Sequence, residues 1–165
     1  MYETLSMYPE DKSELYELLH NQLKALLEDE TFLIPNLSNA SALLAGALSY
    51  INWAGFYLMN KNELLLGPFQ GKPACIHIPI GKGVCGTAAA EGRTQLVPDV
   101  HEFPGHIACD SASRSEIVVP MCLNGKLVGV LDIDSPIKGR FDKQDQDGLE
   151  EFARILTNGI NWNHV

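Results

Sequence analysis

The sequence predicts an α+β fold, with an antiparallel sheet in the middle of the chain and helices at both ends. Apolar side chains recur every three or four positions over residues 11–29 and 141–162, as in helices that pack by one face. Between them lie two pairs of apolar segments, each pair flanking a short polar turn, as β-hairpins do. A hairpin joins antiparallel strands, so we expect a mainly antiparallel sheet.

Length and composition favour a single domain over residues 1–165. A chain of 165 residues, 45% of them hydrophobic, is long enough for a real core and short for two. We expect a helical segment over 1–50, the sheet and its loops over 51–137, and a last helix over 141–162.

The charge of the chain excludes several classes of partner. With 21 acidic residues against 12 Lys and Arg, the net charge is −9, whereas nucleic acid and anionic membranes need a positive surface. No stretch reaches the roughly 18 apolar residues of a membrane span, and the acidic N-terminus lacks the apolar core of an export signal. We therefore expect a cytoplasmic protein whose ligands are small cations or zwitterions.

The N-terminal segment predicts two helices. Leu15, Leu19 and Leu26 lie on one face of the first, over residues 11–29. We expect the second to run from about Asn39 to Tyr50, separated from the first by Pro35. Its candidate cap residues are Asn36, Ser38 and Asn39.

The first hairpin joins residues 53–59 and 63–69 through a polar turn. Trp53 and Tyr57 face the same side of its first strand, because side chains alternate along a strand. Ordinary sheet packing and a wall of a ligand pocket both remain open for this aromatic pair.

Two cysteines follow the first hairpin. Cys75 stands at the start of a short strand that ends at Pro79, and Cys85 follows a glycine turn that opens a short helix. The positive end of a helix dipole favours a thiolate, so Cys85 is a candidate reactive thiol. The alternative is that Cys85 is a small packing residue.

The second hairpin is the strongest strand signal and should lie at the centre of the sheet. Residues 117–123 and 126–133 are apolar and flank Asn124-Gly125, a turn pair suited to a two-residue hairpin. Asp132 and Asp134 project from the same side of the second strand. Either the strand emerges into solvent there, or the carboxylates stand at the mouth of a pocket.

The register of this hairpin decides where Glu116 points. A strict two-residue turn pairs Glu116 with Ile133 and turns it away from Asp132 and Asp134. The three carboxyl groups converge only if one residue is added to the ladder, and Pro120, which cannot donate a backbone hydrogen bond, is the candidate marker of such a bulge.

A long loop over residues 99–115 carries Cys109, and loops of that length are usually functional. The chain has four cysteines, no C-x-x-C pair and no export signal, so a structural disulfide framework is not expected. The spacing of His101, His106 and Cys109 matches no common zinc motif, and we expect no metal.

The order of these elements resembles a GAF domain, with about six strands, terminal helices on one face of the sheet and a ligand pocket on the other. More specific stretches are similar to the free methionine-(R)-sulfoxide reductases and include three cysteines. These stretches are INWAGFYL at 51–58, LGPFQGKPAC at 66–75, IGKGVCGTA at 80–88, HIACDSASRSEIVVP at 106–120 and GVLDIDS at 129–135.

This resemblance implies a thiol-dependent reduction of free methionine sulfoxide that needs no cofactor. It implies that Cys109 is the nucleophile and that Cys75 or Cys85 resolves the sulfenic acid to a disulfide, which thioredoxin reduces. Glu116, Asp132 and Asp134 would bind and polarise the substrate in a pocket walled by Trp53 and Tyr57. It also suggests a homodimer. The remaining Cys122, in an apolar strand, is expected in the core. The main alternative is a GAF sensor that binds a small molecule without turnover.

The carboxylates pose an electrostatic problem, because negative charge raises the pKa of a nearby thiol. Backbone amides of the loop with His106 and Arg114 could offset them. The alternative, which we prefer, is that Glu116 stays protonated and acts as the acid.

Overall fold

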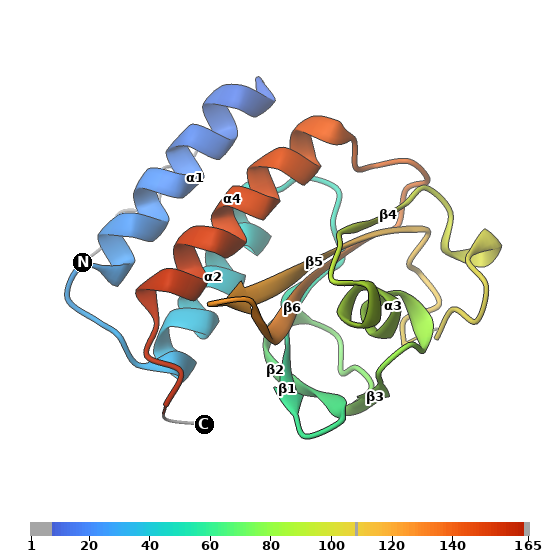
Figure 1. Cartoon of the computed structure of the whole chain (residues 1–165). Coiled ribbons are helices and arrows are strands. Elements are labelled where there is room, and N and C mark those ends of the chain that lie inside the picture. The colour runs from blue at the N-terminus through green and yellow to red at the C-terminus, as the bar shows by residue number, and fades with distance from the viewer. Residues whose placement is uncertain (1–7, 108, 164–165) are drawn as a thin grey trace.

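The fold is an antiparallel six-stranded sheet in the order β3-β2-β1-β6-β5-β4, with helices on both faces (Figure 1). This computed structural model describes residues 8–107 and 109–163. Its strands are β1 Trp53–Asn60, β2 Glu63–Gly71, β3 His77–Pro79, β4 Gln95–Val97, β5 Ser115–Leu123 and β6 Lys126–Ser135. Its helices are α1 Lys12–Leu27, α2 Leu33–Ala47, α3 Gly83–Glu91 and α4 Lys143–Gly159, with a 3-10 turn at Val100–Glu102. The predicted α+β class and antiparallel sheet are confirmed.

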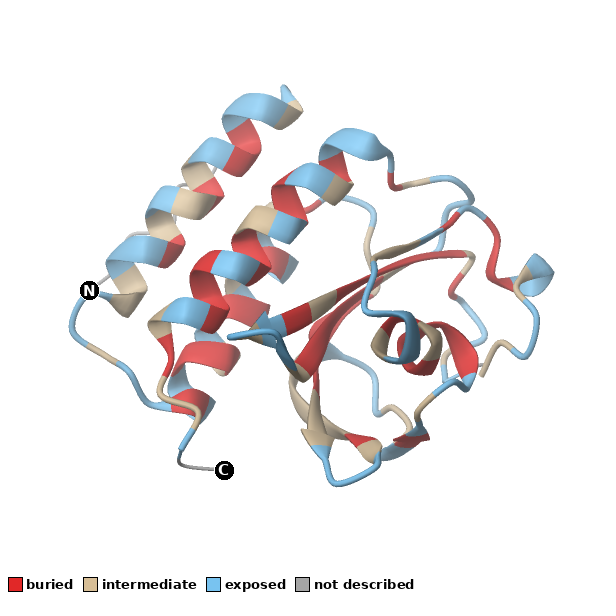
Figure 2. Ribbon diagram, viewed as in Figure 1, coloured by how far each residue is buried: buried red, intermediate tan, exposed pale blue. Residues whose placement is uncertain are grey.

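Two hydrophobic cores lie on the two faces of the sheet. On one face, α2 and α4 pack on the strands and α1 packs against both helices, as expected for the terminal helices. On the other face, α3 covers a smaller core. Buried positions therefore line both sides of the central strands (Figure 2). None of the described helices is both long and apolar enough to cross a membrane.

The central hairpin contains one added residue, which the three carboxyl groups need in order to point to the same side of the sheet. Met121 pairs with Gly129 but Cys122 pairs with Leu127, so β6 has one residue more than β5 at this point. As a result Glu116 pairs with Asp134 instead of Ile133. The predicted one-residue shift is confirmed.

Pro120 does not mark this bulge, so that part of the prediction is wrong. It pairs with Val130 in the regular part of the ladder. The irregularity lies beside Gly129, where a Cβ atom would come within 2.4 Å of the Tyr57 carbonyl oxygen on β1. The bulge therefore lies beside a close approach of the neighbouring strand.

The start of α2 and the burial of Cys122 also differ from expectation. The second helix begins at Leu33, not Asn39, and Pro35 lies in its first turn, where the missing N–H has no helical partner to lose. Asn36 is buried and donates to the backbone carbonyls of Glu30 and Phe32. Cys122 is exposed, because it lies near the end of β5 on the opposite side from buried Met121.

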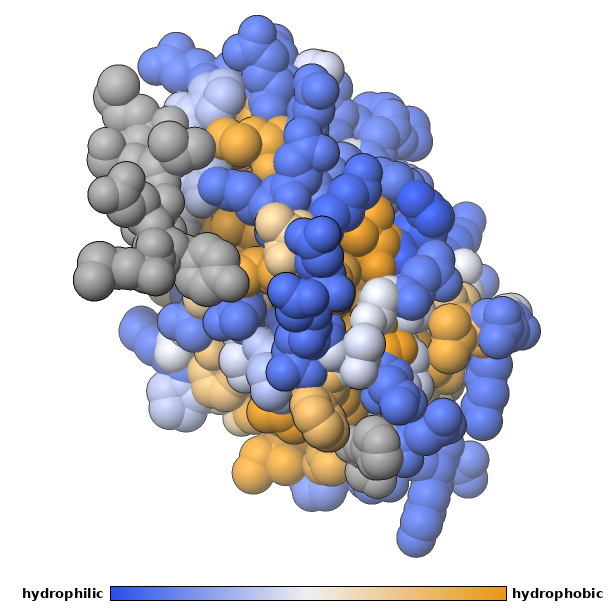
Figure 3. Space-filling view, turned by 90° about the vertical axis from the view of Figure 1, so that its left-hand side faces the viewer, coloured by the Kyte–Doolittle hydropathy of each residue, from blue (hydrophilic) through white to orange (hydrophobic). Residues whose placement is uncertain are grey.

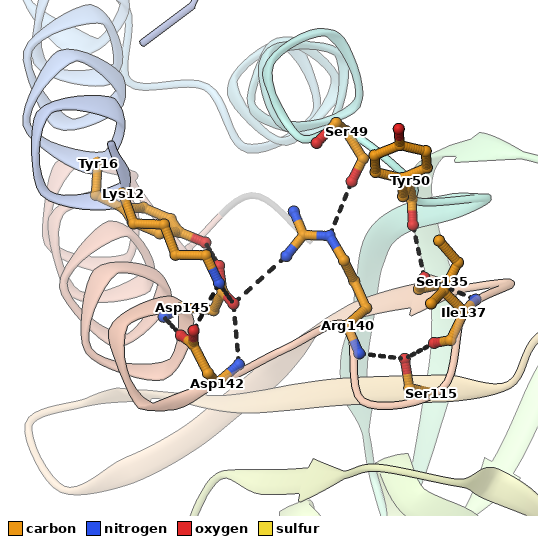
Figure 4. A network of polar contacts seen from close by, with 10 residues as sticks. All are labelled: Lys12, Tyr16, Ser49, Tyr50, Ser115, Ser135, Ile137, Arg140, Asp142 and Asp145. Carbon is orange, nitrogen blue, oxygen red and sulfur yellow. Dashed lines mark hydrogen bonds and ion pairs between the residues drawn. The ribbon is translucent and has the colours of Figure 1, made fainter. Parts of the chain in front are cut away.

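A buried carboxylate joins the first and last helices. Asp145 accepts hydrogen bonds from Lys12 Nζ at 2.6 Å and from the Tyr16 hydroxyl at 2.9 Å (Figure 4). It also forms a capping box with Asp142, the N-cap residue of α4. These bonds hold α1 beside α4.

The same network reaches the strand ends that carry the carboxyl groups (Figure 4). Arg140 donates to the Ser49 carbonyl at 2.9 Å and to Asp145 at 3.4 Å. Its backbone N–H donates to Ser115 Oγ, and the Ser135 hydroxyl donates to the Tyr50 carbonyl. Because Ser115 precedes Glu116 and Ser135 follows Asp134, these bonds hold both ends of the site in place.

Candidate active site

A pocket lies on the α3 face of the sheet, beneath the loop that carries Cys109. It encloses about 540 Å³ of space free of protein atoms, part of it open to solvent. Seven of the eight predicted site residues line it: Trp53, Tyr57, Cys85, Cys109, Glu116, Asp132 and Asp134. The eighth, Cys75, does not line the pocket, but its backbone carbonyl accepts a hydrogen bond from the hydroxyl of Tyr57 at 2.9 Å.

Three carboxyl groups converge at the base of the pocket. Glu116 and Asp134 are cross-strand partners, and Asp132 lies two residues earlier on the same side of β6. Glu116 and Asp132 each keep only 6% of their surface exposed. The bulge described above is what gives all three the same direction.

Burial and mutual repulsion hold protons on these groups. Burial, and then the charges of Asp132 and Asp134, raise the pKa of Glu116 well above its usual range. Burial followed by the charge of Asp132 does the same to the pKa of Asp134. Burial raises the pKa of Asp132 to about 6, although hydrogen bonds with Cys85 and Glu116 oppose the rise. For Glu116 and Asp134 these shifts favour the protonated carboxylic acid form.

Cys85 lies in the first turn of α3, as predicted, and of the two roles left open for it the structure favours the buried packing residue over the thiolate. Cys85 is 4% exposed, and its sulfur lies 3.9 Å from Glu116 Oε1. Burial, then the charges of Asp132 and Glu116, raise the pKa of this thiol well above its usual range. The partial charge of about +0.5 at a helix N-terminus does not outweigh them.

Cys109 and Cys75 form a second thiol pair, on the loop side of the pocket. The Cys109 residue is exposed, but partial burial of its sulfur, and then a hydrogen bond with the Cys75 side chain, raise its pKa to about 12, although a hydrogen bond with the Cys75 backbone opposes the rise. Cys75 is therefore the cysteine whose groups act on the pKa of Cys109.

Trp53 and Tyr57 form a fixed aromatic wall. Their ring centroids lie 5.9 Å apart, and Phe69 stacks on the other side of Trp53 at 5.1 Å. The indole N–H donates to the Lys72 carbonyl at 3.1 Å. With both polar ends bonded, the rings present apolar faces to the pocket.

The two basic residues considered for thiol activation do not supply a cation to Cys109. Arg114 does not line the pocket and lies 3.9 Å from Asp99. His106 does line it, 3.8 Å from Glu116, but burial and then the charge of His101 lower its pKa, so the ring is neutral near pH 7. This favours the alternative in which Glu116 is protonated.

Two features of the site were not predicted. Asn52 donates to both Asp110 and Ser113 at 3.1 Å and so ties the loop to β1. Its place directly before Trp53 in a motif was the available signal. Second, Cys85, Glu116 and Asp132 bring three possible metal ligands within 4.8 Å of one another. His101, weighed for zinc from spacing, instead bonds with Asp99.

Comparison with known proteins agrees with this geometry. Residues 14–160 match the GAF domain family. The free methionine-R-sulfoxide reductase of Escherichia coli is 52% identical over 146 residues, which cover 88% of each chain. The structure of reduced fRMsr from Staphylococcus aureus shares 59% identity with a TM-score of 0.86, covering 88% of this chain and 95% of that one. The Neisseria meningitidis free methionine-R-sulfoxide reductase, solved with its substrate, shares 45% identity with a TM-score of 0.91 over 96% and 95% of the two chains.

The fold and pocket define a GAF-domain protein. Within that class, the chain belongs to the family that contains the free methionine-R-sulfoxide reductases.

Proposed function

We propose that this protein reduces free L-methionine (R)-S-oxide to methionine, with Cys109 as the nucleophile. The observation that carries the proposal is the placement of the Cys109 thiol and a buried carboxyl group, Glu116, with a raised pKa in one pocket. A sulfoxide sulfur is electrophilic only when its oxygen is hydrogen-bonded or protonated, so the reaction needs both groups at once. The relatives reported above bear the name of this activity.

The residues support a balanced sequence of steps. The Cys109 sulfur attacks the sulfoxide sulfur while the sulfoxide oxygen takes a proton from Glu116. Transfer of that oxygen to Cys109 releases methionine and leaves a sulfenic acid. A second thiol then displaces water from the sulfenic acid, and the resulting disulfide takes two electrons from an external dithiol, for which we propose thioredoxin.

Cys75 is the better placed resolving thiol. The side chain of Cys75 acts on the Cys109 thiol, and Cys75 is only partly buried, whereas Cys85 is buried with its sulfur 3.9 Å from Glu116. Attack by Cys85 requires it to leave its carboxyl partners.

The aspartates support recognition of the free amino acid. Asp132 Oδ1 is buried and has no hydrogen-bond partner among the described residues. A substrate ammonium has three donors and satisfies such an acceptor. Its charge also offsets that of the carboxylates, which favours ionisation of Cys109 once substrate is bound.

Methionine release tests the proposal directly. The reduced protein is incubated with racemic free methionine sulfoxide and a dithiol, and free methionine and the remaining epimers are measured. We expect half of the substrate, the R epimer, to be consumed. Tight binding of the sulfoxide without methionine release would instead support a GAF sensor.

We also propose a cytoplasmic homodimer that associates through the helix layer. The face at the left of Figure 1 carries hydrophobic side chains among hydrophilic ones (Figure 3). Phe32 and Ile34, at the start of α2, are 58% and 55% exposed. Light scattering coupled to gel filtration measures the mass, and a monomer at micromolar concentration contradicts this assembly.

A further inference from the structure

Three potential metal ligands meet at the base of the pocket from three separate elements. Cys85 comes from α3, Glu116 from β5 and Asp132 from β6. One ligand atom from each lies within 4.8 Å of the other two, and all three residues are buried. The thiol and the nearer Glu116 oxygen are 3.9 Å apart.

A second observation shows that this cluster lacks a positive partner. Asp132 Oδ1 is buried without a hydrogen bond within the described residues. No Lys or Arg in the described part of the chain forms an ion pair with Glu116, Asp132 or Asp134, and the 3.8 Å contact of His106 with Glu116 carries charge only if the imidazole is protonated. A buried carboxylate oxygen without a donor costs free energy, so the cluster is built to receive a cation from outside.

We propose that Cys85, Glu116 and Asp132 bind a divalent cation of the zinc class, reversibly and in competition with the substrate. The thiolate selects zinc or cadmium over magnesium and calcium, which prefer oxygen ligands alone. Binding displaces the Cys85 proton and any proton held by the two carboxyl groups, and no electron is transferred.

The spacing fits such an ion after a small contraction. Tetrahedral zinc, with bonds of about 2.3 Å to sulfur and 2.0 Å to oxygen, separates its ligand atoms by about 3.3–3.6 Å. The three ligand atoms lie within 4.8 Å of one another, so an inward shift of about an ångström or less by each side chain brings them into that range. The fourth position is open to water or to His106, which lines the same pocket.

Spectroscopy of the metal complex tests the site without relying on activity. Reduced, metal-free protein is titrated with Co²⁺ and Cd²⁺, followed by visible d–d bands and by the ultraviolet cadmium–thiolate band, and Zn²⁺ is titrated by calorimetry. We expect one ion per chain. Cys85→Ser should abolish the thiolate band, and Asp132→Asn should weaken zinc by at least about tenfold, since loss of even an outer-shell partner typically costs 10- to 100-fold.

A matched variant distinguishes this site from the neighbouring thiol pair. In the double variant Cys75→Ser, Cys109→Ser the thiolate band should persist, because neither residue belongs to the cluster. Loss of the band in that variant, with its retention in Cys85→Ser, assigns the metal to the other pair and overturns the proposal. Absence of saturable binding in the wild type also overturns it.

The expected competition between zinc and the substrate is the one part of this inference that rests on the proposed function. Free methionine sulfoxide should raise the apparent Kd for zinc in the double variant, which binds substrate but cannot turn it over. Zinc binding without competition overturns the shared-site assignment. Activity without zinc binding removes only this inference, whereas zinc binding in a protein without activity removes only the proposed function.

Discussion

At the scale of single residues, the pocket keeps protonated carboxyl groups close to thiols. Glu116 has a raised pKa because it is buried beside Asp132 and Asp134. The pKa of Cys109, an exposed residue, is raised by partial burial of its sulfur and then by a hydrogen bond with the Cys75 side chain. A ligand that brings positive charge therefore changes the ionisation of the whole cluster, and its charge is part of the chemistry.

The three site cysteines should respond differently to replacement. We expect Cys109→Ser to abolish methionine formation, because a serine hydroxyl is a far poorer nucleophile toward sulfur. Cys75→Ser should lose thioredoxin-supported turnover yet release about one equivalent of methionine in a rapid-quench burst, since attack precedes resolution. Cys85→Ser should keep more turnover than Cys75→Ser. A burst from Cys109→Ser, with none from the other two variants, contradicts these roles.

Recognition of the ammonium group should depend on Asp134. N-acetyl-methionine sulfoxide lacks that charge, and leaving a buried carboxylate unmatched costs about 3–5 kcal/mol, so its kcat/KM should be at least about 100-fold lower. Asp134→Asn should raise KM for the free substrate and reduce the difference in kcat/KM between the free and the N-acetylated substrate. Steady-state kinetics on both compounds decide the point, and equal turnover of the two by the wild type rules out the ammonium role.

Burial of the Asp132 carboxyl group should make the free energy of unfolding depend on pH. The pKa of Asp132 is about 6 in the folded protein against 3.8 for an ordinary aspartate, so folding strengthens proton binding. The associated stability is present below pH 3.8 and is lost as the pH rises through 6. Asp132→Asn should therefore stabilise the protein by about 3 kcal/mol more at pH 8 than at pH 3.5, measured by urea unfolding. A pH-independent difference contradicts this.

At the scale of elements, close contacts set how α1, α4 and the hairpin fit together. A Cβ atom at Gly148 in α4 would lie 2.2 Å from the Tyr16 ring of α1. Only glycine allows the two helices this approach, which lets the Tyr16 hydroxyl reach Asp145. In the hairpin, the bulge in β6 sets the register that brings the three carboxyl groups to one side of the sheet.

Gly148→Ala should therefore destabilise the protein, although alanine is the better helix former. The Tyr16 ring must move, and overpacking of this kind costs about 1–3 kcal/mol. Gly46→Ala in α2 is the control, because its Cβ meets nothing within 4 Å, and it should stabilise by about 0.5–1 kcal/mol. The two midpoints in guanidinium chloride should shift in opposite directions, and a shared direction contradicts the packing argument.

At the scale of the whole molecule, the sheet separates stability from chemistry. The larger core and the Asp145 network lie with the helices, while the pocket lies on the opposite face beneath α3 and the loop. Hydrogen bonds of Ser115 and Ser135 at the strand ends are among those that connect the two sides. Changes within the helix layer should therefore affect folding more than catalysis.

Asp145→Asn tests that separation. Its carboxylate is 1% exposed and bonds with Lys12 and Tyr16, so loss of its charge should lower the free energy of unfolding by about 3 kcal/mol. Below its unfolding transition the variant should keep the wild-type KM. Thermal unfolding and kinetics at 15 °C and 25 °C measure both properties, and a changed KM with unchanged stability contradicts the separation.

The sequence by itself determined the kinds of element, their order and the residues of the pocket. Those features depend on local signals: the apolar period of the helices, the Asn124-Gly125 turn and the motifs around the cysteines. It also indicated that Glu116 could join Asp132 and Asp134 only through an added residue, which the β6 bulge supplies.

Tertiary structure alone decided where the added residue of the hairpin lies, which groups lie near each thiol, and how the pKa of each thiol shifts. The bulge lies beside the close approach of β1 at Gly129, a contact between strands far apart in the chain. Cys75 acts on the pKa of Cys109, and Cys85 lies 3.9 Å from Glu116, through folding of separate elements onto one another. The pKa of Cys85 rises because burial and nearby charge outweigh the helix dipole, and burial is a property of the packed molecule and not of any one segment.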